Sequence, residues 1–276
     1  MKTLVWAEVV KLAKQSKTYY ALGAVFLIEC LIFITAYYQG STILDVLLDS
    51  LKQSFYFEGT LLNGNLILYI VLNGLWFNVP LIIMIITSGI LTDEYKDGTI
   101  QTTLLQAVNK GSFIGAKYIV AVGFTLFIIT FMLLSSSALA YSIFGKGDLV
   151  VYLQTLNFFP AADAFRRICW AFASGAVAML FYSVVSVTLA VWIKEAAKTW
   201  IAAALFLIIT NLLLKLDLGI TIANHFFFPK LMDTWQAFFY NEIDWSSVWI
   251  NNAVLLGYGV LLTSIGVWAF RKQDIG

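Results

Sequence analysis

Residues 92–117, TDEYKDGTIQTTLLQAVNKGSFIGAK, form a polar interruption between two long apolar segments and decide how the chain is organised. The first part of this stretch is rich in charge, with Asp93, Glu94, Lys96 and Asp97. Gly98 is expected to break the chain before a short helix, and Thr99 is expected to cap that helix. The helix would place its apolar residues on one face: Ile100, Leu104, Ala107 and Val108. A short amphipathic helix against a membrane suits docking to a soluble partner.

The composition of the whole chain is that of an integral membrane protein. Of its 276 residues, 61% are hydrophobic and 12% are charged, and the mean hydropathy is +0.85. Soluble domains carry about 25% charged residues. The net charge of +1 gives no field that would attract nucleic acid. The first apolar run begins near Tyr19 and is too long for a signal-peptide core, so we expect no cleavable signal.

Windows of about 20 apolar residues predict six membrane-spanning helices. They cover residues 18–38, 66–91, 118–143, 169–193, 199–216 and 247–270. The predicted fold class is an all-α integral membrane protein with one transmembrane domain over residues 1–276. Most of the 17 Lys and Arg residues fall in segments that are cytoplasmic if the N-terminus is inside. This bias predicts that both termini and the loop at residues 92–117 are cytoplasmic.

Motif-level detail in three segments points to a family. The first segment combines Glu94, the pair Gly98 and Thr99, the pair Leu104 and Leu105, and the small residues that lead to Lys117. These elements resemble the cytoplasmic coupling loop of permeases of ABC-2 type ABC transporters. Residues 1–16, with Glu8, Lys11 and Lys14, resemble the elbow helix of that family along the membrane surface, and residues 270–275 resemble its tail. One departure is residues 107–110, Ala-Val-Asn-Lys, where the family often has a proline and an arginine.

The resemblance implies a permease subunit of an ATP-driven exporter in a bacterial cytoplasmic membrane. A second permease subunit would complete a homo- or heterodimer, and a separate ATPase subunit would bind ATP and Mg. A periplasmic or extracellular partner would also be compatible. By resemblance, the residues that couple to the ATPase would be Glu8, Lys11, Asp93, Glu94, Lys96, Gly98, Thr99 and Leu104.

No stretch of this sequence has the spacing of a phosphate-binding loop, GxxxxGK followed by Ser or Thr. The chain is therefore not expected to be an enzyme or to bind a cofactor itself. Its single histidine, His225, lies beside Phe226 in an aromatic segment and is expected to be structural. We predict no catalytic set and no metal site.

Four polar residues fall inside predicted spans: Glu29, Asn73, Asn78 and Asn211. An ionisable residue in hydrocarbon is costly and usually faces a cavity or a partner. Glu29 is therefore either part of a substrate path or a neutral carboxyl bonded inside the bundle. The three asparagines would share a polar seam with it or serve as contacts between helices. Small residues on the fourth span, Ala171, Gly175 and Ala178, predict close helix packing.

The predicted outer segments also carry patterns. Residues 43–55 place Ile43, Val46, Leu47, Leu51 and Phe55 on one face, which predicts a helix lying in the outer interface. Residues 147–167 have a similar mixture of apolar and polar residues. Within them, Asp163 would offset Arg166 and Arg167 if that piece is helical. Residues 216–245 are dense in aromatic side chains, which favour the headgroup level.

Three other functions remain compatible with the sequence. The first is an ion-coupled secondary transporter that works without an ATPase, with Glu29 as the coupling group. Only Pro80 lies inside a predicted span, however, so the interrupted helices typical of such transporters are missing. The second is an ABC-type machine that transmits force and moves no solute. The third, a membrane-embedded enzyme, is disfavoured because no catalytic constellation is visible. Lipids, peptides, drugs and metal-maturation cargo are all compatible substrates.

Overall fold

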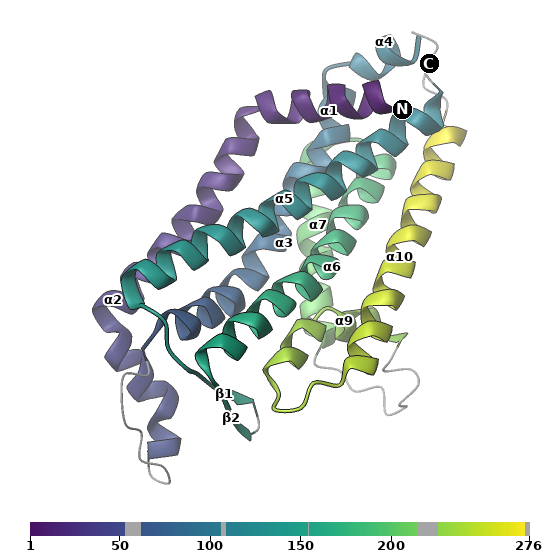
Figure 1. Cartoon of the computed structure of the whole chain (residues 1–276). Coiled ribbons are helices and arrows are strands. Elements are labelled where there is room, and N and C mark those ends of the chain that lie inside the picture. The colour runs from purple at the N-terminus through teal and green to yellow at the C-terminus, as the bar shows by residue number, and fades with distance from the viewer. Residues whose placement is uncertain (53–61, 106–108, 154, 215–225, 274–276) are drawn as a thin grey trace.

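The computed structural model describes residues 1–52, 62–105, 109–153, 155–214 and 226–273, with the backbone alone for residues 41–52. Helices dominate these residues, and six are long and apolar enough to cross a membrane, as predicted (Figure 1). These six are α2 (Ser16–Lys52), α3 (Gly64–Lys96), α5 (Lys110–Phe144), α6 (Ala161–Ile193), α7 (Ala196–Leu214) and α10 (Trp245–Lys272). The chain is an all-α protein of the multi-pass membrane class, with one small β-hairpin added.

The helix α6 lies at the centre of the bundle. In its most apolar window 72% of the residues are buried, against 28% in α2, 22% in α7 and 17% in α10. It packs along α3, α5, α7 and α10. The small residues predicted to allow close packing, Ala171, Gly175 and Ala178, are all buried on α6. The tip of the Trp76 indole of α3 lies directly over Gly175, so the small-residue stripe serves contact within this chain.

The prediction that residues 92–117 form a loop is wrong in its boundaries. The helix α3 continues to Lys96 and α5 begins at Lys110, so only residues 97–109 connect the two. The short helix α4 (Thr99–Leu105) lies in this connection. Gly98 precedes it with φ of 66°, a left-handed conformation that suits glycine, and this confirms the predicted break. Thr99 is the first helical residue, so it does not occupy the capping position.

Two expectations about the predicted outer segments need correction. The helix α2 has no break after residue 38 and continues to Lys52. The side chains proposed for an interfacial face at residues 43–55 lie outside the described residues. Within residues 147–167, β1 (Leu149–Leu153) pairs antiparallel with β2 (Thr155–Phe159), a hairpin that the mixture of apolar and polar residues did not predict. Leu149 and Val151 point inward, which is the period-two pattern of a half-buried strand.

Much of the aromatic segment before α10 packs inside the protein, and its predicted place at the headgroup level stays a prediction. It contains α9 (Phe228–Leu231) and the 3-10 helix η1 (Thr234–Phe239). Trp235, Phe238 and Phe239 are each at most 2% exposed. The Trp235 ring lies 5.3 Å from that of Trp76 on α3, measured between centroids. Neighbouring parts of the protein therefore cover the rings of this irregular segment.

Arg167, at the start of α6, holds this aromatic segment in place. Its Nη1 donates to the carbonyl oxygens of Phe238 and Tyr240 at 2.9 and 2.8 Å, and its Nε donates to Asp163 at 2.7 Å. Its guanidinium also lies 4.3 Å from the centroid of the Phe159 ring. The expectation that Asp163 offsets the two arginines on a helix is thereby confirmed.

Replacing Arg167 by methionine is expected to lower the free energy of unfolding by about 2 kcal/mol, because hydrogen bonds to charged groups contribute about 1.5–3 kcal/mol. The measurement is unfolding in detergent, followed by tryptophan fluorescence. Arg166→Met is the matched control, since the Arg166 side chain is 72% exposed and, among the described residues, bonds to Asp163 alone. Equal stabilities of the two variants would show that Arg167 does not anchor the segment.

Candidate functional site

Charged side chains from α1 (Lys2–Lys14), α3 and α5 meet at the end of the bundle where α1 and α4 lie (Figure 1). The Lys117 Nζ atom lies 2.6 Å from Glu8 Oε2 and 2.6 Å from Glu94 Oε1. Lys11 also donates to Glu94 Oε1. We call these four residues, Glu8, Lys11, Glu94 and Lys117, the charge network. Its two cations and two anions give the charge network a net charge of zero.

The charge network is largely withdrawn from solvent. The side chain of Lys117 is 0% exposed and that of Glu94 is 4% exposed, whereas Glu8 and Lys11 are 14% and 40% exposed. Taking such charges out of water costs several kcal/mol for each ion, and mutual pairing offsets that cost. Removing any single member of the network would therefore be costly, because its partner would stay buried with less compensation. It fixes α1 against α3 and α5.

Neighbouring residues explain how Lys117 and α1 reach these positions. Glu8 and Lys11 are three residues apart and so share one face of α1, beside the buried Leu12. The Lys117 ammonium lies 4.9 Å from the centroid of the Phe113 ring. That ring stacks on Phe270 of α10 with centroids 5.7 Å apart. Cation–π attraction adds to the ion pairs when the site is desolvated.

A second ion pair joins the same turn of α3 to the start of α2. Lys17 donates to Asp93 Oδ2, and both side chains are 28% exposed. The last turn of α3 is therefore bound to α1 through Glu94 and to α2 through Asp93. Movement of this turn would carry both N-terminal helices with it.

The helix α4 lies beyond this turn and exposes one face. Ile100 is 2% exposed and Leu104 is half-buried, so these two residues face the bundle. Gln101 and Thr102 are exposed, and Leu105 is 86% exposed. Lys96 and Asp97 are exposed immediately before α4. Ala107 and Val108 lie outside the described residues. The free face of α4 thus presents an uncovered leucine among polar groups.

Gln273, just after α10, ties the other helix ends together. Its Nε2 donates to the Val191 carbonyl of α6 at 2.9 Å, and its Oε1 accepts from the Tyr95 hydroxyl at 3.2 Å. Its carbonyl accepts from Lys110 Nζ at 2.7 Å. Lys194, which follows α6, places its ammonium 5.7 Å from the centroid of the Tyr95 ring. The ends of α3, α5, α6 and α10 are therefore held as a group.

The residues predicted to couple to an ATPase divide into three sets. Glu8, Lys11 and Glu94 lie in the charge network, and Asp93 lies in the second ion pair. Lys96, Gly98 and Thr99 are exposed, and Leu104 is half-buried. The burial of Glu94 does not suit direct contact with a soluble partner. Sequence reasoning missed Lys117 as a charge partner, although a lysine at the start of an apolar span signals that it needs one.

Glu29 and the three asparagines do not form a polar seam. Glu29 is 0% exposed, and its Oε2 accepts from the Ser135 hydroxyl at 2.7 Å. Its Oε1 has no hydrogen-bond partner within the described part of the chain. Each asparagine is exposed and donates to a carbonyl of its own helix: Asn73 to Tyr69, Asn78 to Gly74, and Asn211 to Leu207. The four residues therefore do not line one path within this chain.

His225, which was expected to be structural, lies outside the described residues. Among those that are described, no group of three His, Cys, Asp or Glu side chains could hold a metal ion. The sequence model of the family described as "Protein of unknown function (DUF2705)" matches residues 24–276. No curated protein matches the chain.

Proposed function

This chain belongs to the DUF2705 family, and we propose that it is the membrane-spanning permease subunit of an ATP-driven ABC transporter of the ABC-2 type. The observation that carries the proposal is the charge network. It joins α1, the expected elbow helix, to the last turn of α3 and the first turns of α5. A short helix with a free apolar residue follows that same turn. Coupling to a separate motor protein needs a docking element that is rigidly connected to several helices.

In this proposal the ATPase moves α4, and the charge network transmits that motion to the neighbouring helices. Closure of the partner ATPase would press on α4, which is joined to α3 by the short turn at Gly98. The last turn of α3 would then move together with α1 through Glu94 and with α2 through Asp93. Coupling requires that the partner favour one arrangement of these helices over another. Glu94 thus transmits the motion and does not itself form the docking surface.

The proposal extends to partners and location. A second permease subunit completes the dimer, and the partner ATPase holds ATP and Mg, so this chain is not itself an enzyme. The membrane is the bacterial cytoplasmic membrane, with both termini and α4 on the cytoplasmic side. Export is the favoured direction, and a periplasmic or extracellular partner is compatible. A version that transmits force and moves no solute would use the same coupling.

Replacing Leu105 by aspartate is expected to reduce capture of the ATPase at least about tenfold. A leucine side chain buried at an interface contributes about 1.5–3 kcal/mol, and about 1.4 kcal/mol is tenfold in affinity. The measurement is the amount of an ATPase carrying GxxxxGK[ST] that co-purifies with the tagged chain in mild detergent. Unfolding of the variant should match that of the parent, because Leu105 is 86% exposed.

Leu105→Met is the matched control and is expected to retain the ATPase. Equal capture by Leu105→Asp would show that α4 is not the docking element. If no such ATPase co-purifies even with the parent chain, the permease assignment fails altogether.

A second function is favoured by one observation, the burial of Glu29 with one carboxyl oxygen unpartnered among the described residues. In this alternative the chain is an ion-coupled secondary transporter. Reconstitution into liposomes separates the two functions. Flux driven by an ion gradient without ATP, and abolished by Glu29→Gln, would favour the secondary transporter. Flux that requires the ATPase and survives Glu29→Gln would favour the permease, and ATP hydrolysis without flux would favour the force-transmitting version.

A further inference from the structure

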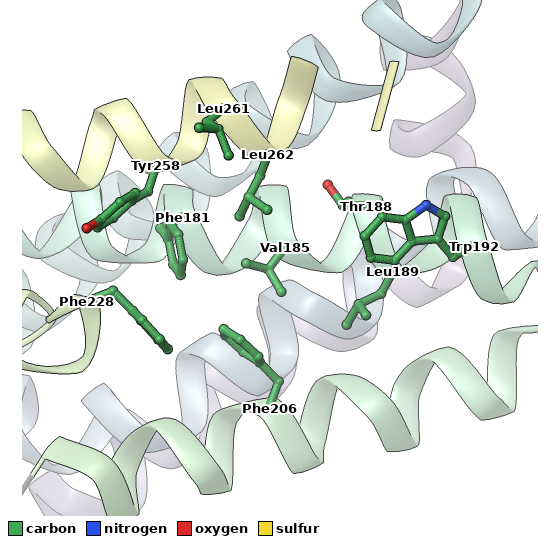
Figure 2. A pocket seen from close by; sticks show the side chains of 10 residues that line it. All are labelled: Phe181, Val185, Thr188, Leu189, Trp192, Phe206, Phe228, Tyr258, Leu261 and Leu262. Carbon is green, nitrogen blue, oxygen red and sulfur yellow. The ribbon is translucent and has the colours of Figure 1, made fainter. Parts of the chain in front are cut away.

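An apolar groove runs along α6 between α7 and α10 (Figure 2). Its volume is about 350 Å³. Phe181 and Val185 of α6 form the buried floor, Phe206 of α7 forms one wall, and Leu262 of α10 forms the other. The Thr188 hydroxyl also lies at the floor but is bonded to the Tyr118 hydroxyl at 2.8 Å. The groove therefore offers apolar contact and almost no free hydrogen-bonding group.

One end of the groove is closed by aromatic rings. Phe228 of α9 stacks on Phe206, with centroids 5.9 Å apart and planes 10° apart, and lies 5.8 Å from Phe181. Figure 2 shows these three rings gathered at the same end of the groove. The Tyr258 hydroxyl donates to the Phe226 carbonyl at 2.8 Å and fixes α10 to this segment. A guest that enters the groove would stop at the phenylalanine rings.

The other end carries residues typical of a membrane interface. Trp192 is 54% exposed, and the exposed Lys194 follows it on the chain. The bond from Gln273 to the Val191 carbonyl holds the end of α10 beside this end of α6. There the Lys272 ammonium lies 4.2 Å from the centroid of the Trp268 ring. Tryptophan and lysine together mark the headgroup level, and the lysines favour an anionic group.

The length of the groove matches one leaflet of a bilayer. From Phe181 to Trp192 the helix rises roughly 16 Å, at about 1.5 Å per residue. The hydrocarbon core of a bilayer is about 30 Å thick, so one leaflet is about 15 Å. The groove thus reaches from the headgroup level to the bilayer centre. Its walls belong to spanning helices, so the molecules that reach its lateral opening are those of the hydrocarbon layer.

We propose that this groove binds one acyl chain of an anionic phospholipid, drawn from the leaflet on the side of α1 and α4. The methyl end of the chain lies against Phe181, Phe206 and Phe228. The phosphate lies near Lys194 and Lys272. Burial of apolar surface supplies the affinity, and the two lysines select the anionic headgroup. The site is independent of the permease assignment, because it needs no ATPase.

The test uses the full chain in nanodiscs of phosphatidylcholine that contain a trace of photoreactive phospholipid, with the reactive group near the end of one acyl chain. The probe is phosphatidylglycerol in one sample and phosphatidylcholine in the other. Mass spectrometry then locates the crosslinks. The hollow between α2 and α3, lined by Ile28, Leu31 and Ile32, is the internal comparison for ordinary boundary lipid. We expect phosphatidylglycerol to label the phenylalanine end of the groove several-fold more than phosphatidylcholine does, with no such preference at the α2–α3 hollow.

Two variants sharpen the result. Lys194→Gln should lower the preference for phosphatidylglycerol about fivefold, since one basic residue near an anionic surface contributes about 1 kcal/mol. Leu262→Trp should fill the groove and remove its label while the label at the α2–α3 hollow stays. Equal labelling of both hollows, or no preference for phosphatidylglycerol, overturns the proposal. A disulfide between two copies carrying Leu261→Cys, in place of lipid label, would show that a second copy covers the groove and would overturn it also.

Discussion

Replacing Lys117 by methionine is expected to lower the free energy of unfolding by about 3–5 kcal/mol, the usual cost of leaving a buried charge without its partner. Lys117 is 0% exposed and is bonded to both Glu8 and Glu94. Methionine fills most of the space of the lysine stem but leaves the two carboxylates facing each other. The helix α1 should then loosen from α3 and α5. Chemical unfolding in detergent measures the loss of stability.

Lys17→Met is the matched control for this variant. It removes the lysine of the second ion pair, in which both side chains are 28% exposed, so at most about 1 kcal/mol should be lost. The pair of substitutions Lys117→Met and Glu94→Gln should recover part of the stability, because one buried charge of each sign is then gone. A Lys117→Met protein as stable as Lys17→Met would mean that the charge network contributes little to the fold.

Replacing Gly175 by leucine is expected to cost about 3 kcal/mol, at the upper end of the usual range for overpacking. A Cβ atom at Gly175 would lie 1.8 Å from the Trp76 indole, which must then move. The centroid of the Trp235 ring lies 5.3 Å from that of the Trp76 ring, so Trp235 limits the movement of Trp76. The aromatic segment before α10 should loosen together with the α3–α6 contact. Unfolding in detergent and the accessibility of Trp235 to an aqueous quencher would report the change.

Gly257 on α10 offers the matched substitution. A Cβ atom at Gly257 meets no atom within 4 Å, so Gly257→Leu should leave stability unchanged or raise it slightly. If Gly175→Leu behaves in the same way, the Trp76 side chain has room to swing aside, and the close approach of α3 and α6 is not a requirement of the fold.

The six spans could be predicted from hydropathy because each carries a long apolar window, and that signal needs no knowledge of neighbours. Their ends could not. The helix α5 begins at Lys110, eight residues before the predicted boundary at residue 118, and Lys117 in this first part is paired with Glu8 and Glu94 of other helices. A hydropathy window scores Lys117 as a polar residue and contains no information about the two carboxylates that pair with it.

The hairpin and the aromatic segment differ from expectation for a related reason. Residues 149–159, LVVYLQTLNFF, are rich in β-branched and aromatic residues, a strand signal that could have been recognised. The aromatic pattern of residues 216–245 predicts the headgroup level and does not predict that Trp235 is buried. That burial depends on the packing of η1 against α3, α6 and α10, which bring together residues far apart in the sequence.

Part of the candidate site could also be predicted from the sequence, and part of it could not. The sequence distinguishes residues 92–117 by their polarity, and the family resemblance singles out Glu8, Lys11 and Glu94. Their roles were assigned to contact with a partner, whereas the structure pairs them with one another and with Lys117. Charge in a polar stretch looks the same in sequence whether it faces solvent or a buried counter-ion. The exposed Leu105 belonged to the same motif but was given no role of its own.

The tight turn between α6 and α7 bears on how the chain enters its membrane. Only Lys194 and Glu195 separate Ile193 from Ala196, and Lys194 adopts a φ of 63° to make the reversal. A connection this short cannot let α6 cross the bilayer and leave α7 behind, so the two helices must insert together as a helical hairpin. The hydrophobicity of α6 then carries the shorter α7 across. The orientation of α6 and α7 in the membrane is therefore decided in a single insertion event.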